Sequence, residues 1–310
     1  LLYSMPIPAT TGFSTTFTNI GEVRNRGIEF EVNTKNIVGK FNWQTSFNFS
    51  KNKNTVEDLG GVDNVISGDG TGMNWILRKG EPMFSYYGYK IVGVYQDAAD
   101  LAATPGLAGS RPGSPKFEDR DGNKIIDAND KQLLGNFQPK AILGMVNNFS
   151  YNNFDLSIAM QASLGAKMYN YENQFYQGAL LGAMRRSLVE NQWWSAADPG
   201  NGKVPASALT TLGSQTISDA YIEDASFLAL RNVNLGYTLP EALTRKLRVT
   251  NFRVYLSGSN LLLLTKKQFH GYNPEGYTKG EVTGAASTPG SNQGAEPISR
   301  IYAVGFNFNF

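Results

Sequence analysis

Large apolar and small polar residues alternate along the end of the chain. One side of this extended segment carries the apolar residues Tyr302, Val304, Phe306, Phe308 and Phe310. The other side carries only alanine, glycine and asparagine, because successive side chains of a strand point to opposite faces. Such a strand is typical of a membrane β-barrel wall, with lipid outside and a polar lumen inside. An edge strand of a soluble β-sandwich is the alternative that the pattern leaves open.

The same alternation predicts strands along most of the chain. Between 154 and 165, apolar residues occupy the even positions, and polar or small residues occupy the odd ones. Comparable patterns predict further strands at 28–33, 41–49, 141–151, 227–239 and 252–265. With the opening residues and the extended stretches 73–78 and 86–95, this gives about ten strands. A change of frame at Arg231-Asn232 predicts a β-bulge, and 240–247 predicts one helical turn.

The links between these strands alternate between short and long. Short links are expected near 35–40, 80–82, 151–153 and 240–248. Long links are expected near 7–21, 52–70, 96–138, 166–225 and 266–297. Outer-membrane barrels have this asymmetry, with short periplasmic turns and long extracellular loops, whereas a soluble sandwich has no reason for it. The sequence therefore predicts an all-β fold, a transmembrane antiparallel β-barrel, with Phe310 at its periplasmic end.

Composition agrees with this interpretation and excludes other classes. The chain has 310 residues with 18 Phe, 15 Tyr and 33 Gly, which suits many strands, turns and aromatic girdles. A net charge of +2 without a basic run gives no support for nucleic-acid binding, and the absence of cysteine excludes disulfides. No apolar run reaches the roughly 18 to 20 residues of a transmembrane helix, so a membrane location requires a closed barrel. The opening Leu1-Leu2-Tyr3 is no signal peptide, and it predicts a fragment of a longer protein.

Short motifs spread in order over the chain carry a family resemblance. They include Asn25-Arg26-Gly27-Ile28-Glu29, Tyr87-Gly88-Tyr89-Lys90, Gly93-Val94-Tyr95-Gln96, Leu230-Arg231-Asn232-Val233, Leu235-Gly236-Tyr237, Gly271-Tyr272-Asn273-Pro274-Glu275 and the closing Gly305-Phe306-Asn307-Phe308-Asn309-Phe310. Each motif is short, but the ordered set is specific. The chain resembles the C-terminal part of the SusC/RagA-like TonB-dependent transporters of Bacteroidetes-type bacteria.

This resemblance implies a barrel of about 22 strands whose lumen is filled by a plug. The plug and the segment that contacts TonB are not in this chain, which would supply about ten of those strands. The implied function is active import of a nutrient, an oligosaccharide or a peptide, across the outer membrane with energy from TonB. A SusD-like surface lipoprotein would act as the lid. The terminal Phe310 resembles the signal that the barrel assembly machinery recognises.

Two alternatives of other classes remain at this point. A passive, porin-like or purely structural barrel would share the wall but lack the plug. A secreted carbohydrate-binding β-protein would share the strands but stay soluble without detergent. Catalysis has little support, because His270 is the only histidine and no thiol nucleophile is present. Glu29 and Glu31 resemble paired carboxylates, but we expect them to line a wet lumen.

The loop 119–130 has the spacing of a calcium-binding loop. Oxygen ligands fall at Asp119, Asp121, Asn123, Asp127 and Asp130, and the carbonyl of Ile125 completes the set. Ile126 takes the place of the usual apolar anchor. Lys124 replaces the glycine that permits the sharp turn, and Asp130 replaces the longer glutamate. The sequence predicts a Ca²⁺ site that stiffens an extracellular loop, and the alternative is an Asx-rich turn facing water.

Aromatic residues gather in the insertion 166–225. Trp193, Trp194 and Tyr176 offer flat surfaces for stacking on a ligand or for contact with the lid protein. Packing of a long loop on itself explains the same residues, and no spacing selects a ligand. The three residues are therefore predicted as candidate ligand or lid contacts, with loop packing as the alternative.

Overall fold

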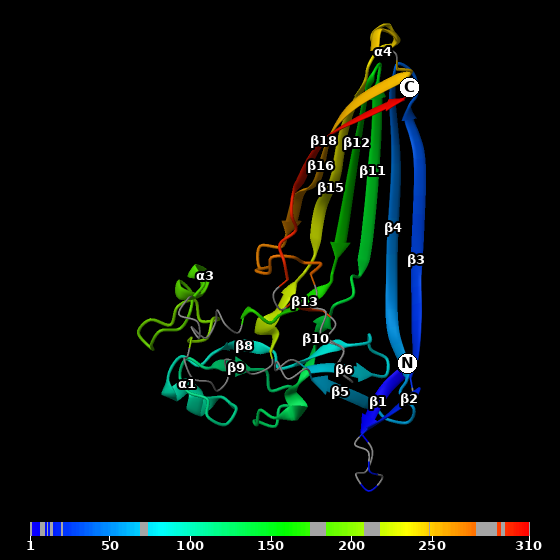
Figure 1. Ribbon diagram of the computed structural model, residues 1–310. Coiled ribbons are helices and arrows are strands. Elements are labelled where there is room, and N and C mark those ends of the chain that lie inside the picture. Colours follow the sequence, from blue (N-terminus) through cyan, green and yellow to red (C-terminus); the bar gives the residue numbers. More distant parts are fainter. Residues whose placement is uncertain are drawn as a thin grey trace.

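Seven antiparallel strands form one long sheet in the computed structural model (Figure 1). The structure describes residues 2–6, 10, 12, 15–19, 21–68, 74–173, 184–207, 218–247, 249–276, 290–292 and 295–309. The sheet order is β18-β16-β15-β12-β11-β4-β3. The strands are β3 (Glu22–Ile37), β4 (Phe41–Asp58), β11 (Ala141–Tyr151), β12 (Phe154–Leu164), β15 (Phe227–Thr238), β16 (Asn251–Thr265) and β18 (Ile301–Asn309). The sheet is open, because its outer strands β18 and β3 are not joined by a ladder.

Strand pairing places side chains of one kind in rows across the sheet. One row contains Phe49, Leu143, Ala162, Leu228 and Leu264. A row on the opposite face contains Gln44, Asn148, Ser157, Asn234 and Ser257. Register is fixed wherever the two faces differ, because a slip by one residue would exchange them. The alternation predicted from sequence is therefore confirmed as one apolar face and one polar face.

Aromatic side chains concentrate at one end of the apolar face. Neighbouring rings meet across strands, with centroid distances of 5.8 Å for Trp43–Phe149, 4.6 Å for Phe154–Tyr237 and 6.2 Å for Phe252–Phe306. Aromatic cross-strand pairs stabilise adjacent strands beyond their hydrogen bonds. They also form a belt close to the short turns of the sheet.

The short turns lie together at the upper end of the sheet in Figure 1. They join β3 to β4 around Gly39, β11 to β12 at Asn152, and β15 to β16 through the predicted helical turn α4 (Glu241–Leu247). Asn152 adopts a left-handed φ of 51°, which asparagine tolerates in tight turns. The predicted bulge is also confirmed, since the register of β15 shifts between Leu230 and Asn232.

Three stretches predicted as wall strands do not join the long sheet. The stretch 73–78 forms β6 (Asn74–Arg78), and 86–95 forms parts of β7 (Ser85–Gly88) and β8 (Ile91–Val94). The opening residues form the hairpin β1 (Leu2–Pro6) and β2 (Thr15–Asn19). The prediction of about ten wall strands was therefore wrong for the described residues, and the turn at 80–82 lies outside the sheet.

At 73–78 the physical reason is that the strand is covered on both faces. Trp75, Ile76 and Leu77 are consecutive and all buried, which a wall strand with one polar face does not allow. They belong to a four-stranded sheet in the order β10-β7-β6-β5, with β5 (Asn64–Gly68) and β10 (Gln132–Asn136) as outer strands. Strands β8 and β9 (Pro115–Phe117) form a separate pair.

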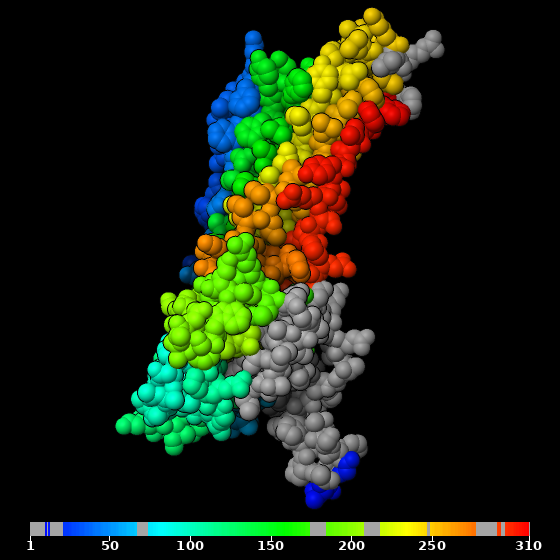
Figure 2. Space-filling view, turned by 90° about the vertical axis from the view of Figure 1, so that its left-hand side faces the viewer, coloured from blue at the N-terminus to red at the C-terminus, as the bar shows by residue number. Residues whose placement is uncertain are grey.

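The hydrophobic core lies beyond the lower end of the long sheet. Its largest cluster contains Trp75, Tyr86, Tyr169 and Tyr221. The small elements around it are α1 (Ala98–Ala103), η2 (Ala128–Asp130), β13 (Lys167–Asn170), α3 (Arg186–Val189), η3 (Asp219–Tyr221), β14 (Ile222–Asp224) and β17 (Ser291–Asn292). The two long insertions are 96–138 and 166–225. Figure 2 shows their described parts, cyan to green in the first and yellow-green in the second, massed at this end. None of the helices in the described ranges is long and apolar enough to cross a membrane.

Candidate functional sites in the long insertions

The loop 119–130 winds its carboxylates around backbone amides. Asp119 accepts hydrogen bonds from the amides of Gly122 at 2.8 Å and Lys124 at 2.9 Å. One carboxylate oxygen of each of Asp119, Asp121 and Asp130 lies within 4.8 Å of the other two. The structure thus brings three of the predicted ligands together in an acidic cluster that could hold an ion.

The remaining predicted ligands have local roles in the loop. Asn123 accepts a hydrogen bond from the amide of Ile125 at 2.7 Å. Asp127 lies outside the acidic cluster and caps η2, where it exchanges bonds with Asp130 in a capping box. Asp130 is fully buried and also accepts from the amide of Arg120 at 2.8 Å. Lys124 adopts a φ of 65°, the left-handed conformation for which the calcium loop normally uses glycine.

The predicted apolar anchor of this loop is confirmed. Ile126 is 5% exposed and packs with Tyr89 and Phe117, whereas its neighbour Ile125 is 62% exposed. Burial raises the pKa of the Tyr89 hydroxyl, and the charges of Asp130 and Asp127 raise it further. Lys131 lies 5.5 Å from the centre of the same ring. Ile126 therefore fastens the loop to Tyr89, which lies between β7 and β8, and to Phe117 of β9.

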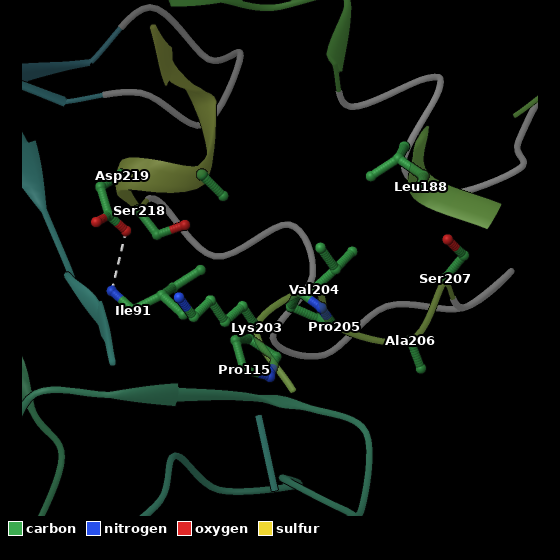
Figure 3. Close-up of a pocket in the computed structure, with 11 residues that line it drawn as sticks. Ile91, Pro115, Leu188, Lys203, Val204, Pro205, Ala206, Ser207, Ser218 and Asp219 are labelled. Carbon is green, nitrogen blue, oxygen red and sulfur yellow. Dashed lines mark hydrogen bonds between the residues drawn. The ribbon is translucent and has the colours of Figure 1, made fainter. Parts of the chain in front are cut away.

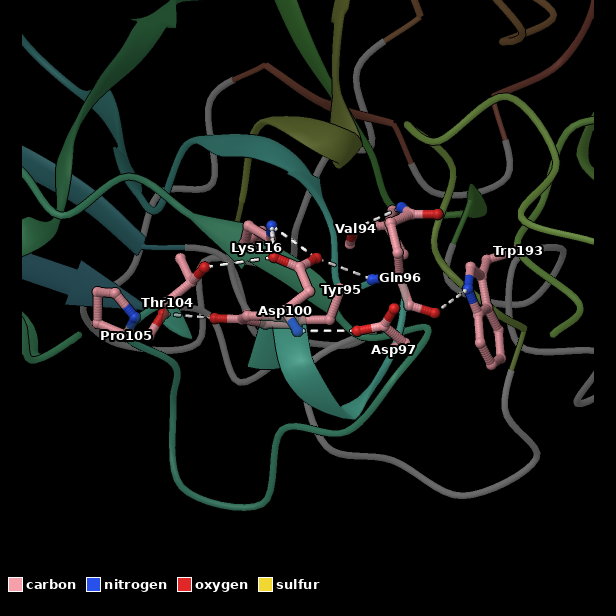
Figure 4. A network of polar contacts seen from close by, with 9 residues as sticks. All are labelled: Val94, Tyr95, Gln96, Asp97, Asp100, Thr104, Pro105, Lys116 and Trp193. Carbon is pink, nitrogen blue, oxygen red and sulfur yellow. Dashed lines mark hydrogen bonds and ion pairs between the residues drawn. The ribbon is translucent and has the colours of Figure 1, made fainter. Parts of the chain in front are cut away.

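Trp193 and Trp194 point to different surroundings. The indole N–H of Trp193 donates to the carbonyl of Gln96 at 3.1 Å, so this ring joins two insertions (Figure 4). A side chain at Gly113 would meet the Trp193 ring at 2.5 Å, which shows how closely the insertions pack. Trp194 is exposed and donates to the carbonyl of Val189 at 3.2 Å. Tyr176 and Phe310 lie outside the described residues.

A network of charged and polar groups stabilises the first insertion beside Trp193 (Figure 4). Lys116 binds both carboxylate oxygens of Asp100, at 2.6 and 2.8 Å, and lies 5.3 Å from the centre of the Tyr95 ring. The hydrogen bonds from Lys116 and from the amide of Gln96 lower the pKa of the Asp100 carboxyl. Every member of this network has a structural partner, so it positions the insertion rather than forming a reactive site.

Sequence reasoning missed a cavity between the two insertions. It has a volume of about 340 Å³, and Asp219 lies at its edge (Figure 3). The carboxylate of Asp219 accepts a hydrogen bond from the amide of Ile91 at 2.9 Å. Burial raises the pKa of this carboxyl. Nothing in the sequence singled Asp219 out, because Ile91 and Pro115, which share the cavity with it, come from segments far away along the chain.

The single histidine lies at the exposed edge of a polar cluster around the buried Glu223. Its ring Nδ1 lies 3.0 Å from Glu223, whose carboxylate also accepts from Asn173 at 2.8 Å and from the His270 amide. The two strand carboxylates considered above, Glu29 and Glu31, are exposed on the polar face of β3. These contacts tie β14 to the chain around 270 and supply no nucleophile.

Comparison with known proteins identifies relatives over the whole chain. No protein-family model matches. The TonB-dependent receptors P3 and P26 of Formosa agariphila are 35% and 31% identical, and each match covers all of this chain and 31% of the relative. The TonB-dependent receptor SusC of Bacteroides thetaiotaomicron is 31% identical over 89% of this chain and 26% of its own length.

Solved structures agree on the fold. The RagAB peptide transporter superposes with a TM-score of 0.77 at 24% identity, covering all of this chain and 32% of that one. The RagAB importer in its open-open state gives 0.76 at 23% identity. The present chain spans about a third of the length of these proteins. TonB-dependent transporters are not enzymes, in agreement with the prediction from sequence. The chain belongs to the SusC/RagA-like family of TonB-dependent receptors, which are proteins of the bacterial outer membrane.

Proposed function

We propose that the protein containing this chain imports an oligosaccharide or a peptide across the outer membrane with energy from TonB. The long sheet would form part of the wall of a closed barrel, with its apolar face toward lipid and its polar face toward the lumen. Strands outside this chain would complete the barrel to about 22 strands, and a plug outside this chain would fill it. The observation that carries the proposal is the two-faced sheet with short turns at one end, in a member of this family.

Deletion of TonB tests this function against a passive barrel. Cells expressing the full-length protein are supplied with a mixture of glucose oligomers and a tryptic digest of casein, and depletion is followed by mass spectrometry. We expect some components to disappear only when both the protein and TonB are present. Depletion that depends on the protein but not on TonB would identify a passive pore. Recovery of the protein in the soluble fraction without detergent would identify a secreted β-protein instead.

A SusD-like lipoprotein is the proposed partner at the insertion end. RagAB is a complex of two proteins, and this chain has an exposed aromatic residue, Trp194, next to α3. We expect Trp194→Ala to weaken co-purification of the lipoprotein by about tenfold or more, because exposed tryptophans often dominate binding energies. Tyr151→Ala is the matched control, since Tyr151 is 54% exposed against 55% for Trp194 but ends β11 at the short turn.

Ca²⁺ is the ion proposed for the acidic cluster. Carboxylate oxygens are the ligands that Ca²⁺ prefers, and Asp119, Asp121 and Asp130 bring three of them together. The role would be to stiffen the loop. Calorimetry with CaCl₂ on the full-length protein should show uptake that the double variant Asp119→Ala, Asp121→Ala removes. Asp198→Ala, in another insertion, is the control. Equal uptake by the wild type and the double variant, or none by either, would show that the cluster binds no Ca²⁺ and that the loop is only a structural turn.

A further inference from the structure

The cavity between the two insertions is bounded by segments that are distant in sequence. Ile91 and Pro115 come from β8 and β9, Leu188 comes from α3, and 203–207 and 218–220 close the remaining sides (Figure 3). Ligand sites occur preferentially at such junctions between structural units. The volume of about 340 Å³ lies at the small end of the range for ligand pockets. A ligand of the size of a short peptide would fill it.

The described walls of the cavity are mainly apolar. Side chains of isoleucine, leucine, valine, alanine and proline make up most of the lining, with two serines. The described residues of the lining include no aromatic side chain, whereas a flat ring suits stacking on a sugar. Burial of an apolar side chain against such walls is favourable, because it removes apolar surface from water. The walls therefore favour an apolar side chain over a hydroxyl-rich ring.

Two opposite charges face this apolar space. Asp219 is partly buried, and among the described residues its carboxylate has a hydrogen bond from Ile91 but no ion pair. Lys203 is an exposed residue whose side chain extends along the cavity toward the side of Ile91 and Asp219 (Figure 3), and the described part of the chain offers it no ion pair either. The partly desolvated carboxylate of Asp219 therefore gains most from a ligand that supplies a counter-charge, whereas the exposed Lys203 gains less from one.

We propose that this cavity binds a short peptide of two or three residues with free ends and an apolar side chain. The amino group lies at Asp219, the carboxylate at Lys203, and the apolar side chain packs against Leu188 and Val204. This inference rests on the proposed import function, because it chooses the peptide among the two substrate classes considered there. The residue roles are separable: Asp219 selects the ammonium group, whereas the apolar walls select the side chain.

The raised pKa of Asp219 agrees with this assignment. Burial is the first cause of the shift, the charge of Lys90 opposes it and that of Glu118 adds to it. The carboxylate is therefore under-compensated in the free protein, and a ligand ammonium would supply the missing partner. The alternative role of Asp219 is structural, as the acceptor that holds the amide of Ile91. The two roles predict different results for Asp219→Asn. The asparagine oxygen can still accept the hydrogen bond from the Ile91 amide, so a structural role would be kept, whereas the charge that attracts an ammonium group would be lost.

Calorimetry on the purified full-length protein in detergent tests the proposal. Dileucine, N-acetyl-dileucine, diglycine and maltotriose are compared on the wild type, Asp219→Asn and Lys203→Met. We expect dileucine to bind with a dissociation constant of about 1 mM or tighter. Asp219→Asn, N-acetylation and replacement by diglycine should each weaken binding at least tenfold, and Lys203→Met should weaken it severalfold. Glu190→Gln and Lys79→Met, which remove charges outside the cavity, should leave the affinity unchanged.

Several outcomes would overturn the proposal. They are the absence of saturable dileucine binding, equal affinity in the wild type and Asp219→Asn, and maltotriose binding that the same variants abolish. An unchanged melting temperature of Asp219→Asn shows that a loss of affinity does not come from unfolding. The import function is judged separately, by whether uptake depends on TonB. TonB-dependent uptake that is unaffected by Asp219→Asn, with no dileucine binding, would remove this site and leave the transporter.

Discussion

The long sheet and the insertions use the same large apolar residues in opposite ways. In the sheet, Leu256 stays 54% exposed in the middle of a row of apolar side chains. In the insertions, Trp75 is 1% exposed and packs against Tyr86 and Tyr169. Exposed apolar rows of this extent are rare on proteins surrounded by water. The insertions therefore complete their core within this chain, whereas the apolar face of the sheet requires contacts with something outside the chain.

A charge placed on the apolar face of the sheet should have the largest effect on the free energy of unfolding. Ile158 lies in the middle of β12, and Ser157 beside it faces the polar side. In a lipid-facing wall, Ile158→Arg should cost about 2–4 kcal/mol of the free energy of unfolding. Urea unfolding of the full-length protein in lipid vesicles measures this cost. Ser157→Arg is the control and should cost little, so equal effects of the two substitutions would contradict the lipid-facing assignment.

The core of the insertions should lose stability when a buried apolar side chain is shortened, because no lipid can fill the space. Ile126→Ala removes a buried side chain from the cluster with Tyr89 and Phe117. We expect a loss of about 2 kcal/mol in the stability of the loop 119–130, at the low end for such substitutions because the cluster is small. Hydrogen exchange of the loop measures it. Ile125→Ala is the control, and a similar loss there would show that Ile126 is not the anchor.

Gly113 lies where the two insertions pack closely at the Trp193 ring. Gly113→Ala would place a Cβ 2.5 Å from the Trp193 ring and 2.9 Å from the side chain of Ala206, at a φ of 87°. We expect a cost of about 1–2 kcal/mol beyond that of the unfavourable φ, because the close packing must open. Gly80→Ala has nearly the same φ, 85°, in open space and isolates this difference. Tryptophan fluorescence and proteolysis of 186–207 report it, and equal behaviour of both variants would contradict close packing.

The smallest effect concerns pH. Because burial raises the pKa of Asp219 above its ordinary value of 3.8, this carboxylate takes up a proton at a higher pH than an exposed aspartate does. Affinity for the peptide ammonium should therefore be full above the raised pKa and fall as the pH drops through it. Dileucine titrations at a series of pH values measure this loss. Asp219→Asn should remove the pH dependence, and a loss that persists in this variant would assign it to another group.

The long sheet could be predicted from the sequence more completely than the insertions. Alternation in β12 gives both faces correctly, because a strand with lipid on one side and water on the other must alternate. The same reading failed at 73–78, where Ile76 between Trp75 and Leu77 was the sign of a strand buried on both faces. The spacing of the acidic loop correctly predicted that the carboxylates of Asp119, Asp121 and Asp130 lie close together. The spacing did not predict that Asp127 would cap η2 and lie outside the acidic cluster.

The cavity was beyond prediction for a different reason. Asp219 and Ile91 meet only because β8 lies beside η3, and no local pattern encodes a contact between segments so far apart. Trp193 and Trp194 are adjacent in sequence, yet one joins two insertions and the other is exposed. Adjacent residues of irregular segments have no fixed relation to a face, unlike the residues of a strand.

Site-directed spin labelling along β12 distinguishes a lipid-facing wall from a sheet with water on both faces. This chain has no cysteine, so single cysteines can be placed at each position from 154 to 164 without background from it. In lipid vesicles, labels at the even positions should be accessible to oxygen, and labels at the odd positions to a water-soluble nickel complex. A period-two alternation in this phase is the result that a lipid-facing wall predicts. Equal access to the nickel complex at every position, or alternation in the opposite phase, would contradict it.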